Sequence, residues 1–175
     1  MAERVIIKEV APRDGLQAQP VHLSLEQRQR LIESLAKTGV PELEIGSFVS
    51  PKAVPQMAGT EQLASQLPAQ PLIYSALVPN MKGFELARDA GIKTQAIAIS
   101  ATEQMNQNNI RKSLTETFAM AADIVKRAAS DSVDIHVYLA VAFECPYEGR
   151  VALRTILAQA AELMTLNPAR LVIAD

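Results

Sequence analysis

Residues 9–17 read Glu9-Val10-Ala11-Pro12-Arg13-Asp14-Gly15-Leu16-Gln17, and they directly follow the first apolar run of the chain, Val5-Ile6-Ile7-Lys8. An apolar strand that ends at an adjacent Arg–Asp pair and a glycine is typical of the active-site rim of an α/β enzyme. There the strand fixes the backbone and Gly15 permits a tight reversal. The same residues are also ordinary turn formers, in which Arg13 and Asp14 make a solvated ion pair. The rest of the chain favours the first interpretation, because similar polar segments follow its later strands.

Strand and helix patterns alternate along the whole chain. The expected strands are Val5–Val10, Leu43–Ile45, Pro71–Leu77, Thr94–Ile99, Asp134–Val141 and Leu171–Asp175. The expected helices begin at two capping boxes, Ser24–Gln27 and Ser113–Glu116, and also cover Thr60–Leu67, Asn80–Ala90 and an apolar stripe formed by Leu153, Ile156, Leu157, Ala160 and Met164. The segments Ser100–Asn109 and Phe143–Gly149 are expected to be polar loops. Strands that alternate with helices over short loops form parallel sheets with right-handed crossovers.

Two architectures fit this alternation, an open doubly wound sheet and part of a (β/α)8 barrel. The glycine-rich phosphate-binding fingerprint of nucleotide-binding open sheets is absent from the sequence. Polar segments follow most of the strands, which favours a TIM barrel whose active site is built from its βα loops. A complete barrel takes about 250 residues. We therefore expect residues 1–175 to be the N-terminal part of a single TIM-barrel catalytic domain, with about the first six strands present and the closing strands absent.

Composition excludes several classes of protein. The 175 residues are 49% hydrophobic and 21% charged, as in a soluble globular chain. The formal net charge is −2, and no Lys/Arg cluster is interleaved with aromatic residues, so nucleic acid is not an expected partner. No apolar run approaches the roughly 18 residues of a membrane-spanning helix, and residues 1–4 carry no signal pattern. The single cysteine, Cys145, has no partner for an internal disulfide, which favours the cytoplasm.

Five segments carry motifs: Glu9–Gln17, Glu44–Met57, Ser100–Ile110, Cys145–Gly149 and the final Asp175. Together they resemble the signature segments of hydroxymethylglutaryl-CoA lyase, a divalent-metal TIM-barrel family. The resemblance spans the whole chain, and Glu44–Met57 is its longest and most specific motif. It implies cleavage of 3-hydroxy-3-methylglutaryl-CoA, or a similar 3-hydroxy-acyl-CoA, to acetyl-CoA and a keto acid, with a place in leucine degradation. It further implies an acyl-CoA partner, no membrane partner, and a full-length protein that is compatible with a homodimer.

The resemblance also implies roles for particular residues. Asp14 would be a ligand of Mg²⁺ or Mn²⁺, and Arg13 would stabilise the enolate oxygen that develops during retro-Claisen cleavage. Glu44 is interpreted as a supporting carboxylate paired with Arg13 rather than as a direct ligand. The remaining candidates are Gln17, Ser47, Lys52 and Asn109 as substrate contacts, and Asp175 as a support of the metal shell or catalytic water. Simpler roles stay open for three of them: turn stabilisation for Gln17, a solvated charge for Lys52, and a helix cap for Asp175.

Some features depart from the family pattern. Cys145 is interpreted as structural, because the family's reactive cysteine lies in a later glycine-rich loop, and His136 is interpreted as a packed strand residue. Glu144 stands where a small residue is expected. The family's His-x-His metal ligands, a later Asn ligand and the catalytic cysteine are not found within residues 1–175. We therefore expect residues 1–175 alone to bind metal weakly and to be inactive.

Two other functions remain open from the sequence. One is a related metal-dependent Claisen synthase of the isopropylmalate or homocitrate type, although Pro12 and Gly15-Leu16-Gln17 follow the lyase form. The other is a non-catalytic acyl-CoA-binding half-barrel. Acyl-CoA binding without cleavage would distinguish this last function from the enzymes.

Overall fold

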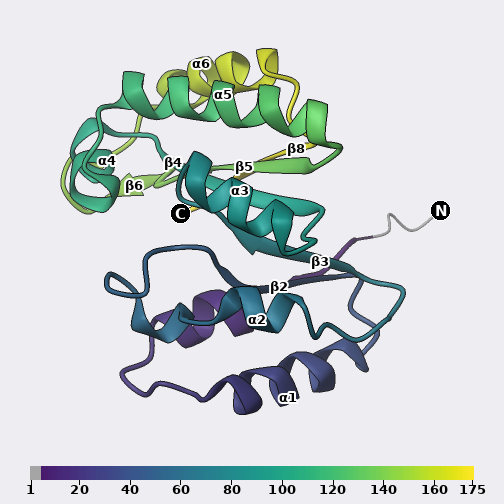
Figure 1. Cartoon of the computed structure of the whole chain (residues 1–175). Helices are drawn as coiled ribbons and strands as arrows, with labels where there is room; N and C mark the ends of the chain where they lie inside the picture. The colour runs from purple at the N-terminus through teal and green to yellow at the C-terminus, as the bar shows by residue number, and fades with distance from the viewer. Residues whose placement is uncertain (1–4) are drawn as a thin grey trace. The chain divides into compact units, whose positions relative to one another are not determined.

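The structure is a computed structural model that describes residues 5–175 (Figure 1). The chain forms two compact units. The first unit runs to Val78 and includes Lys82–Thr94, whereas the second consists of Pro79–Met81 and Gln95–Asp175. The expectation about a signal pattern in residues 1–4 lies outside the described residues. Within residues 5–175, no helix has both the length and the apolar character that crossing a membrane requires.

The strands of the first unit are parallel and lie in the order β1 (Lys8–Glu9), β2 (Glu42–Ser47) and β3 (Ile73–Leu77). The first strand is shorter than expected, because Val5, Ile6 and Ile7 lie outside it and are exposed. Pairing begins where Lys8 meets Glu42, directly after Pro41, which has no backbone N–H to offer. Further along, the register of β2 against β3 shifts between Glu44 and Gly46, as in a β-bulge.

Three helices belong to the first half of the chain: α1 (Leu25–Ala36), α2 (Thr60–Ala64) and α3 (Met81–Asp89). The predicted capping box at the start of α1 is confirmed, since Gln27 N donates to Ser24 Oγ over 3.2 Å and Ser24 N donates to Gln27 Oε1 over 2.8 Å. Two short helical turns, η1 (Ala11–Gly15) and η2 (Pro55–Met57), follow β1 and precede α2. The core side chains of this unit include Ile32, Leu43, Ile45, Leu63 and Phe84.

The strands of the second unit lie in the order β4 (Thr94–Ser100), β5 (Asp134–Ala140) and β8 (Arg170–Ile173). Strands β5 and β8 are parallel, with His136 opposite Arg170. The predicted loop Phe143–Gly149 instead holds part of a small antiparallel hairpin, formed by β6 (Glu144–Cys145) and β7 (Gly149–Arg150). Each long strand is connected to the next through at least one helix, as the parallel α/β pattern predicted.

The helices of the second unit are α4 (Glu103–Ile110), α5 (Leu114–Asp131) and α6 (Leu153–Thr165). The capping box of α5 is confirmed at Ser113 and Glu116. On α6 the predicted apolar stripe is only partly correct. Ile156 is buried, but Leu153, Leu157 and Met164 are exposed at 71%, 59% and 52%, and the most buried side chain is Leu163. Periodicity located the helix, but it did not identify the side that packs against the unit.

The prediction of a polar loop over Ser100–Asn109 is wrong, because most of that segment forms α4. This helix has no apolar periodicity, and its one buried residue is Asn106. The Asn106 amide donates from Nδ2 to the carbonyls of Lys112 and Ser113 over 2.9 and 3.0 Å and to Thr117 Oγ1 over 2.5 Å. Its Oδ1 lies 3.4 Å from the donating N–H of Ser100. One side-chain amide therefore connects the end of β4, helix α4 and the start of α5.

Replacing Asn106 with leucine is expected to loosen α4 while the rest of the second unit stays folded. The substitution removes the donor to the Lys112 carbonyl and the acceptor of the Ser100 N–H, and each buried unsatisfied group costs about 1–3 kcal/mol. The Ser113 carbonyl keeps its hydrogen bonds from Thr117. The amides of α4 should then exchange with solvent at least about 10-fold faster in native-state hydrogen exchange. Asn108→Leu is the matched control, because Asn108 is exposed and donates only locally, to the Gln104 carbonyl. Equal protection in both variants would contradict this role for Asn106.

Candidate active site

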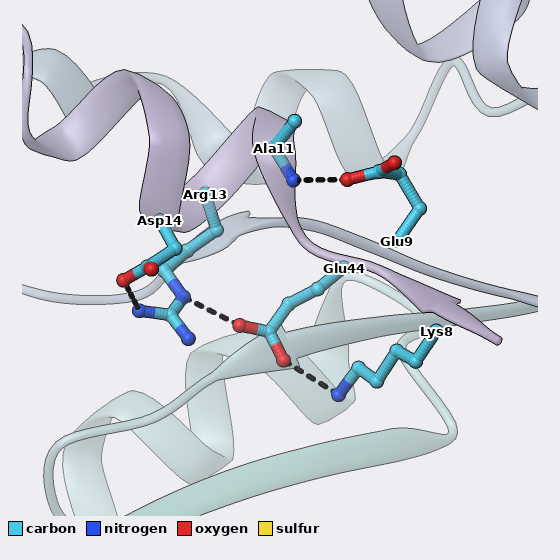
Figure 2. Close-up of polar contacts among 6 residues, drawn as sticks. All are labelled: Lys8, Glu9, Ala11, Arg13, Asp14 and Glu44. Carbon is cyan, nitrogen blue, oxygen red and sulfur yellow. Dashed lines mark hydrogen bonds and ion pairs between the residues drawn. The ribbon is translucent and has the colours of Figure 1, made fainter. Parts of the chain in front are cut away.

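Arg13 and Asp14 lie on η1, a single π-helical turn directly after β1 (Figure 2). Pro12 occupies the first turn, where a backbone N–H is not needed. The N–H groups of Arg13 and Asp14 both donate to the Val10 carbonyl, over 3.0 and 2.8 Å. The side chain of Glu9 supports the start of the turn, since its Oε1 accepts from Ala11 N over 2.7 Å.

The predicted tight reversal at Gly15 is wrong. Gly15 closes η1 in a helical conformation and is not among the residues with positive φ. A Cβ at this position would meet only the Ala11 Cβ, at an ordinary contact distance of 3.6 Å. The backbone after β1 therefore turns by helix formation and does not need the left-handed region that glycine tolerates.

A row of alternating charges connects β1 and the turn η1 to β2 (Figure 2). Lys8 Nζ contacts Glu44 Oε2 at 2.6 Å, and Glu44 Oε1 accepts from Arg13 Nε at 2.5 Å. Arg13 Nη1 in turn contacts Asp14 Oδ1 at 2.6 Å. We call Lys8, Glu44, Arg13 and Asp14 the charge row. The pairing of Arg13 with Glu44 is the contact that was expected for this carboxylate.

Solvent exposure in the charge row is lowest at Glu44 and highest at Asp14. The side chain of Glu44 is 0% exposed, those of Lys8 and Arg13 are 12% and 17% exposed, and that of Asp14 is 65% exposed. The register of β1 against β2 explains why Lys8 and Glu44 meet. Lys8 lies opposite Glu42, and Glu44, two residues further along β2, has the same strand parity. The result is a guanidinium fixed from its buried side, with its other side toward solvent.

This arrangement can stabilise an anionic oxygen. Arg13 uses Nε for Glu44 and Nη1 for Asp14, and its third nitrogen, Nη2, takes part in none of the contacts drawn in Figure 2. A guanidinium is permanently charged, and its donors have a fixed planar geometry. A group held in advance in this way stabilises developing negative charge without reorganising during the reaction.

A metal ion is not accommodated by these residues alone. Within residues 5–175, no three His, Cys, Asp or Glu side chains lie close enough to hold a metal ion. Asp14 is a single exposed carboxylate that is already paired with Arg13. This part of the chain therefore offers at most part of a coordination shell.

The other candidates of the first unit differ in exposure. Gln17 and Lys52 are exposed on the surface. Ser47 is buried at the end of β2, 1% exposed, and its hydroxyl has no hydrogen-bond partner within the described residues. It lines a cavity of about 560 Å³ whose apolar walls include Phe48 and Met57. Ser47 is therefore the candidate substrate contact of this unit that lies in a cavity.

The second unit carries Asn109 and Asp175. Asn109 is exposed near the end of α4. Asp175 Oδ1 accepts from the backbone N–H groups of Phe143 and Glu144 over 3.1 and 3.3 Å. Asp175 thus holds the segment that follows β5, and the metal-shell role remains a prediction.

Cys145 is buried, with 1% exposure, and its Sγ lies 3.0 Å from Thr102 Oγ1. Burial raises the pKa of the Cys145 thiol, but hydrogen bonds from Thr102 and from the backbone N–H groups of Tyr147 and Glu148 outweigh it, so that this pKa lies below its ordinary value. The Thr102 contact ties the start of α4 to the hairpin. His136 is buried at 6% exposure on β5. Both observations fit the structural interpretation of these two residues.

Sequence reasoning missed two basic residues, Lys8 and Arg28. Arg28 on α1 is 1% exposed, and it donates to the Ala58 carbonyl over 2.7 Å and to Thr60 Oγ1 over 3.2 Å. Burial lowers the pKa of Arg28. A Cβ on Gly46 would come within 2.7 Å of Thr60 Oγ1 and 3.0 Å of Arg28 Nη2, so only glycine fits beside this contact. The sequence signal for Lys8 was a charge inside an apolar run.

The sequence of this chain is similar to those of known proteins. The sequence model of the family described as HMGL-like matches residues 4–175. The chain is 39% identical over 166 residues to a hydroxymethylglutaryl-CoA lyase of Pseudomonas mevalonii, covering 94% of this chain and 55% of the relative. It is 35% identical to an (R)-citramalyl-CoA lyase of Chloroflexus aurantiacus, covering 99% of this chain and 58% of the relative. The chain thus spans about half the length of the curated relatives it matches.

A solved structure gives the same result for the fold. The crystal structure of a Bacillus subtilis HMG-CoA lyase matches with a TM-score of 0.96 and 34% sequence identity, covering 99% of this chain and 59% of that one. The predicted fold class is therefore confirmed. It is α/β, and the chain supplies about the first six strands of a (β/α)8 TIM barrel.

Proposed function

Since the chain belongs to the HMGL-like family, we propose that it forms part of a carbon–carbon lyase that acts on an acyl-CoA. The proposed substrate is 3-hydroxy-3-methylglutaryl-CoA or a similar 3-hydroxy-acyl-CoA, and the products are acetyl-CoA and a keto acid. We also propose that residues 1–175 are the N-terminal part of one catalytic TIM-barrel domain. The observation that carries the proposal is the Arg13 guanidinium, held by the buried Glu44 directly after β1.

The chemistry is a retro-Claisen cleavage. The 3-hydroxyl loses its proton, its oxygen becomes the carbonyl of the keto acid, and the bond between C2 and C3 breaks. The electron pair of that bond passes to C2 and onto the thioester oxygen as an enolate, which then takes up a proton at C2 to give acetyl-CoA. Arg13 would donate to the thioester oxygen as its negative charge develops. Glu44 would hold the guanidinium in place through Nε.

The remaining site assignments belong to the same proposal. Asp14 is proposed as one ligand of a Mg²⁺ or Mn²⁺ ion, for which residues 5–175 supply no complete ligand set. The proposed substrate contacts are Gln17, Ser47, Lys52 and Asn109, and Asp175 is a proposed support. A reducing, cytoplasmic location belongs to the same proposal, and it is supported by Cys145 being a free thiol with no disulfide partner among the described residues.

Residues 1–175 alone are expected to show no lyase activity and only weak metal binding. One exposed carboxylate supplies too few ligands for a hard divalent cation, which takes six or more oxygen ligands. The measurements are acetyl-CoA release from 3-hydroxy-3-methylglutaryl-CoA and calorimetric titration with Mn²⁺. A full-length family member serves as the positive control, and cleavage by residues 1–175 above background would refute the expectation.

The proposed function itself is tested in the complete protein that carries this chain. The assay offers 3-hydroxy-3-methylglutaryl-CoA and citramalyl-CoA separately and follows the release of acetyl-CoA. Cleavage of either one supports the lyase and identifies the preferred acyl group. Binding of both acyl-CoAs without cleavage would instead identify a non-catalytic acyl-CoA-binding protein.

A further inference from the structure

We propose that Lys8 is a positioning residue for Arg13. By occupying one oxygen of Glu44, it prevents that carboxylate from taking two donors of the guanidinium, and so keeps both N–H donors of Arg13 Nη2 available for the substrate. The contact between Lys8 and Glu44 is observed within the first unit, whereas a role of Lys8 in catalysis rests on the proposed function.

The first step of the argument is the division of the Glu44 carboxylate between two cations. Its side chain is 0% exposed, and each oxygen contacts a different residue, Oε2 with Lys8 Nζ at 2.6 Å and Oε1 with Arg13 Nε at 2.5 Å (Figure 2). A carboxylate buried to this extent needs compensation at both oxygens. In this structure Arg13 compensates the charge at Oε1 and Lys8 compensates it at Oε2.

The second step is the geometry of arginine. The Nε–H and one Nη2–H of a guanidinium point to the same side, and together they match the two oxygens of a carboxylate. Glu44 already contacts Nε, so it stands where this two-donor pair would form. In the observed arrangement the pair is incomplete, and Nη2 takes part in none of the contacts of the charge row.

The third step is the effect of removing the ammonium group. Without Lys8 Nζ, Glu44 Oε2 becomes a buried anionic oxygen without its cation. Arg13 Nη2 is the donor that can replace this cation, because it is bonded to the same carbon as Nε, which Glu44 already contacts. The carboxylate is expected to rotate into the two-donor pair. Arg13 would then hold Glu44 through Nε–H and one Nη2–H and Asp14 through Nη1, so that Nη2 could no longer present both of its N–H donors to a substrate oxygen.

Lys8 acts through Arg13 and is not itself a catalytic residue. It lies on β1, before the turn that carries Arg13 and Asp14, and its side chain is only 12% exposed. An arginine at the same position could also supply a cation to Glu44 Oε2. Lys8→Arg is therefore the conservative variant that should preserve the function of this position, whereas Lys8→Met should abolish it.

The decisive test is nitrogen NMR of the Arg13 guanidinium in the 175-residue chain, with the signal assigned by its loss in Arg13→Lys. In Lys8→Met, rotation about the Arg13 Nε–Cζ bond is expected to slow at least about fivefold, because the two-donor pair must break before the group can turn. Lys8→Arg should keep the wild-type rate. The control is Lys37→Met, at an exposed lysine that follows α1, and it should also keep the wild-type rate.

The wild-type chain provides a measurement that does not depend on whether a variant folds. Its Arg13 Nη2 protons should exchange with water as fast as those of an arginine that has no two-donor partner. Strong protection of these protons in the wild type, or an unchanged rotation rate in Lys8→Met, would overturn the proposal. So would slow rotation in Lys8→Arg.

The catalytic half of the proposal is measured in the complete protein. Lys8→Met should lower kcat about 10- to 100-fold with KM changed by less than about threefold, as for an interaction made mainly in the transition state, and Lys8→Arg should restore most of kcat. If the wild-type protein cleaves no acyl-CoA, the proposed function fails, while the NMR result still decides the role of Lys8. Equal kinetics of Lys8→Met and wild type would refute the catalytic consequence alone.

Discussion

Replacing Arg13 with lysine is expected to lower kcat of the complete protein about 10³-fold, with a much smaller change in KM. The loss of one preorganised donor to a developing oxyanion costs about 10²- to 10³-fold in other enzymes. Lysine also loses the geometry, because one ammonium group cannot contact Glu44 and Asp14 from the positions of Nε and Nη1 and still present a third planar donor. The measurement is steady-state release of acetyl-CoA from 3-hydroxy-3-methylglutaryl-CoA.

Arg30→Lys is the matched control for this prediction. Arg30 also pairs with a carboxylate at 2.6 Å, but both it and its partner Glu26 are exposed on α1. Its substitution should leave kcat and KM unchanged within about twofold, because exposed pairs contribute little. If Arg13→Lys retained more than a tenth of the wild-type kcat, Arg13 would not be the group that stabilises the enolate.

Replacing Glu44 with glutamine is expected to lower the free energy of unfolding of the 175-residue chain by about 3–5 kcal/mol. Removing one partner of a buried ion pair leaves uncompensated charge, and this is the usual size of the effect. Here the carboxylate is fully buried, and two cations, Lys8 and Arg13, would be left facing a neutral amide. Urea denaturation followed by circular dichroism measures the change.

Glu26→Gln provides the comparison, since it breaks the exposed pair with Arg30 and should cost no more than about 1 kcal/mol. The double variant Lys8→Met with Glu44→Gln separates repulsion from lost packing. It should be more stable than Glu44→Gln alone, because one of the two like charges is gone. A Glu44→Gln chain as stable as the Glu26→Gln chain would show that the charge row does not hold the first unit together.

Local signals in the sequence predicted helix starts well. The capping boxes at Ser24 and Ser113 were both confirmed, since the whole signal lies within four residues. Helix α4 was missed for the opposite reason. It packs through the amide of Asn106, and a helix without an apolar face cannot be recognised by periodicity. On α6 the pattern located the helix but assigned Leu153 and Leu157 to the packed side, which only the tertiary arrangement decides.

The candidate site was predicted in part. The pairing of Arg13 with Glu44 was expected, because Glu44 was interpreted, beside the family resemblance, as a carboxylate that supports Arg13. The contribution of Lys8 could not be predicted in this way, because it depends on the register that places Lys8 opposite Glu42. The prediction of a tight reversal at Gly15 was wrong because a glycine after a strand indicates a turn but does not specify that the turn is helical.

The alternation of charge in the row has a consequence for how ligands arrive. Its two positive and two negative side chains cancel, so beyond a Debye length of about 10 Å the group exerts almost no field. An approaching anion is therefore not steered by this part of the surface, and added salt should have little effect on the local contribution to the encounter rate. The site therefore distinguishes one ligand from another only at contact, when a ligand oxygen reaches the edge of the Arg13 guanidinium at Nη2, which pairs with neither Glu44 nor Asp14 in the charge row.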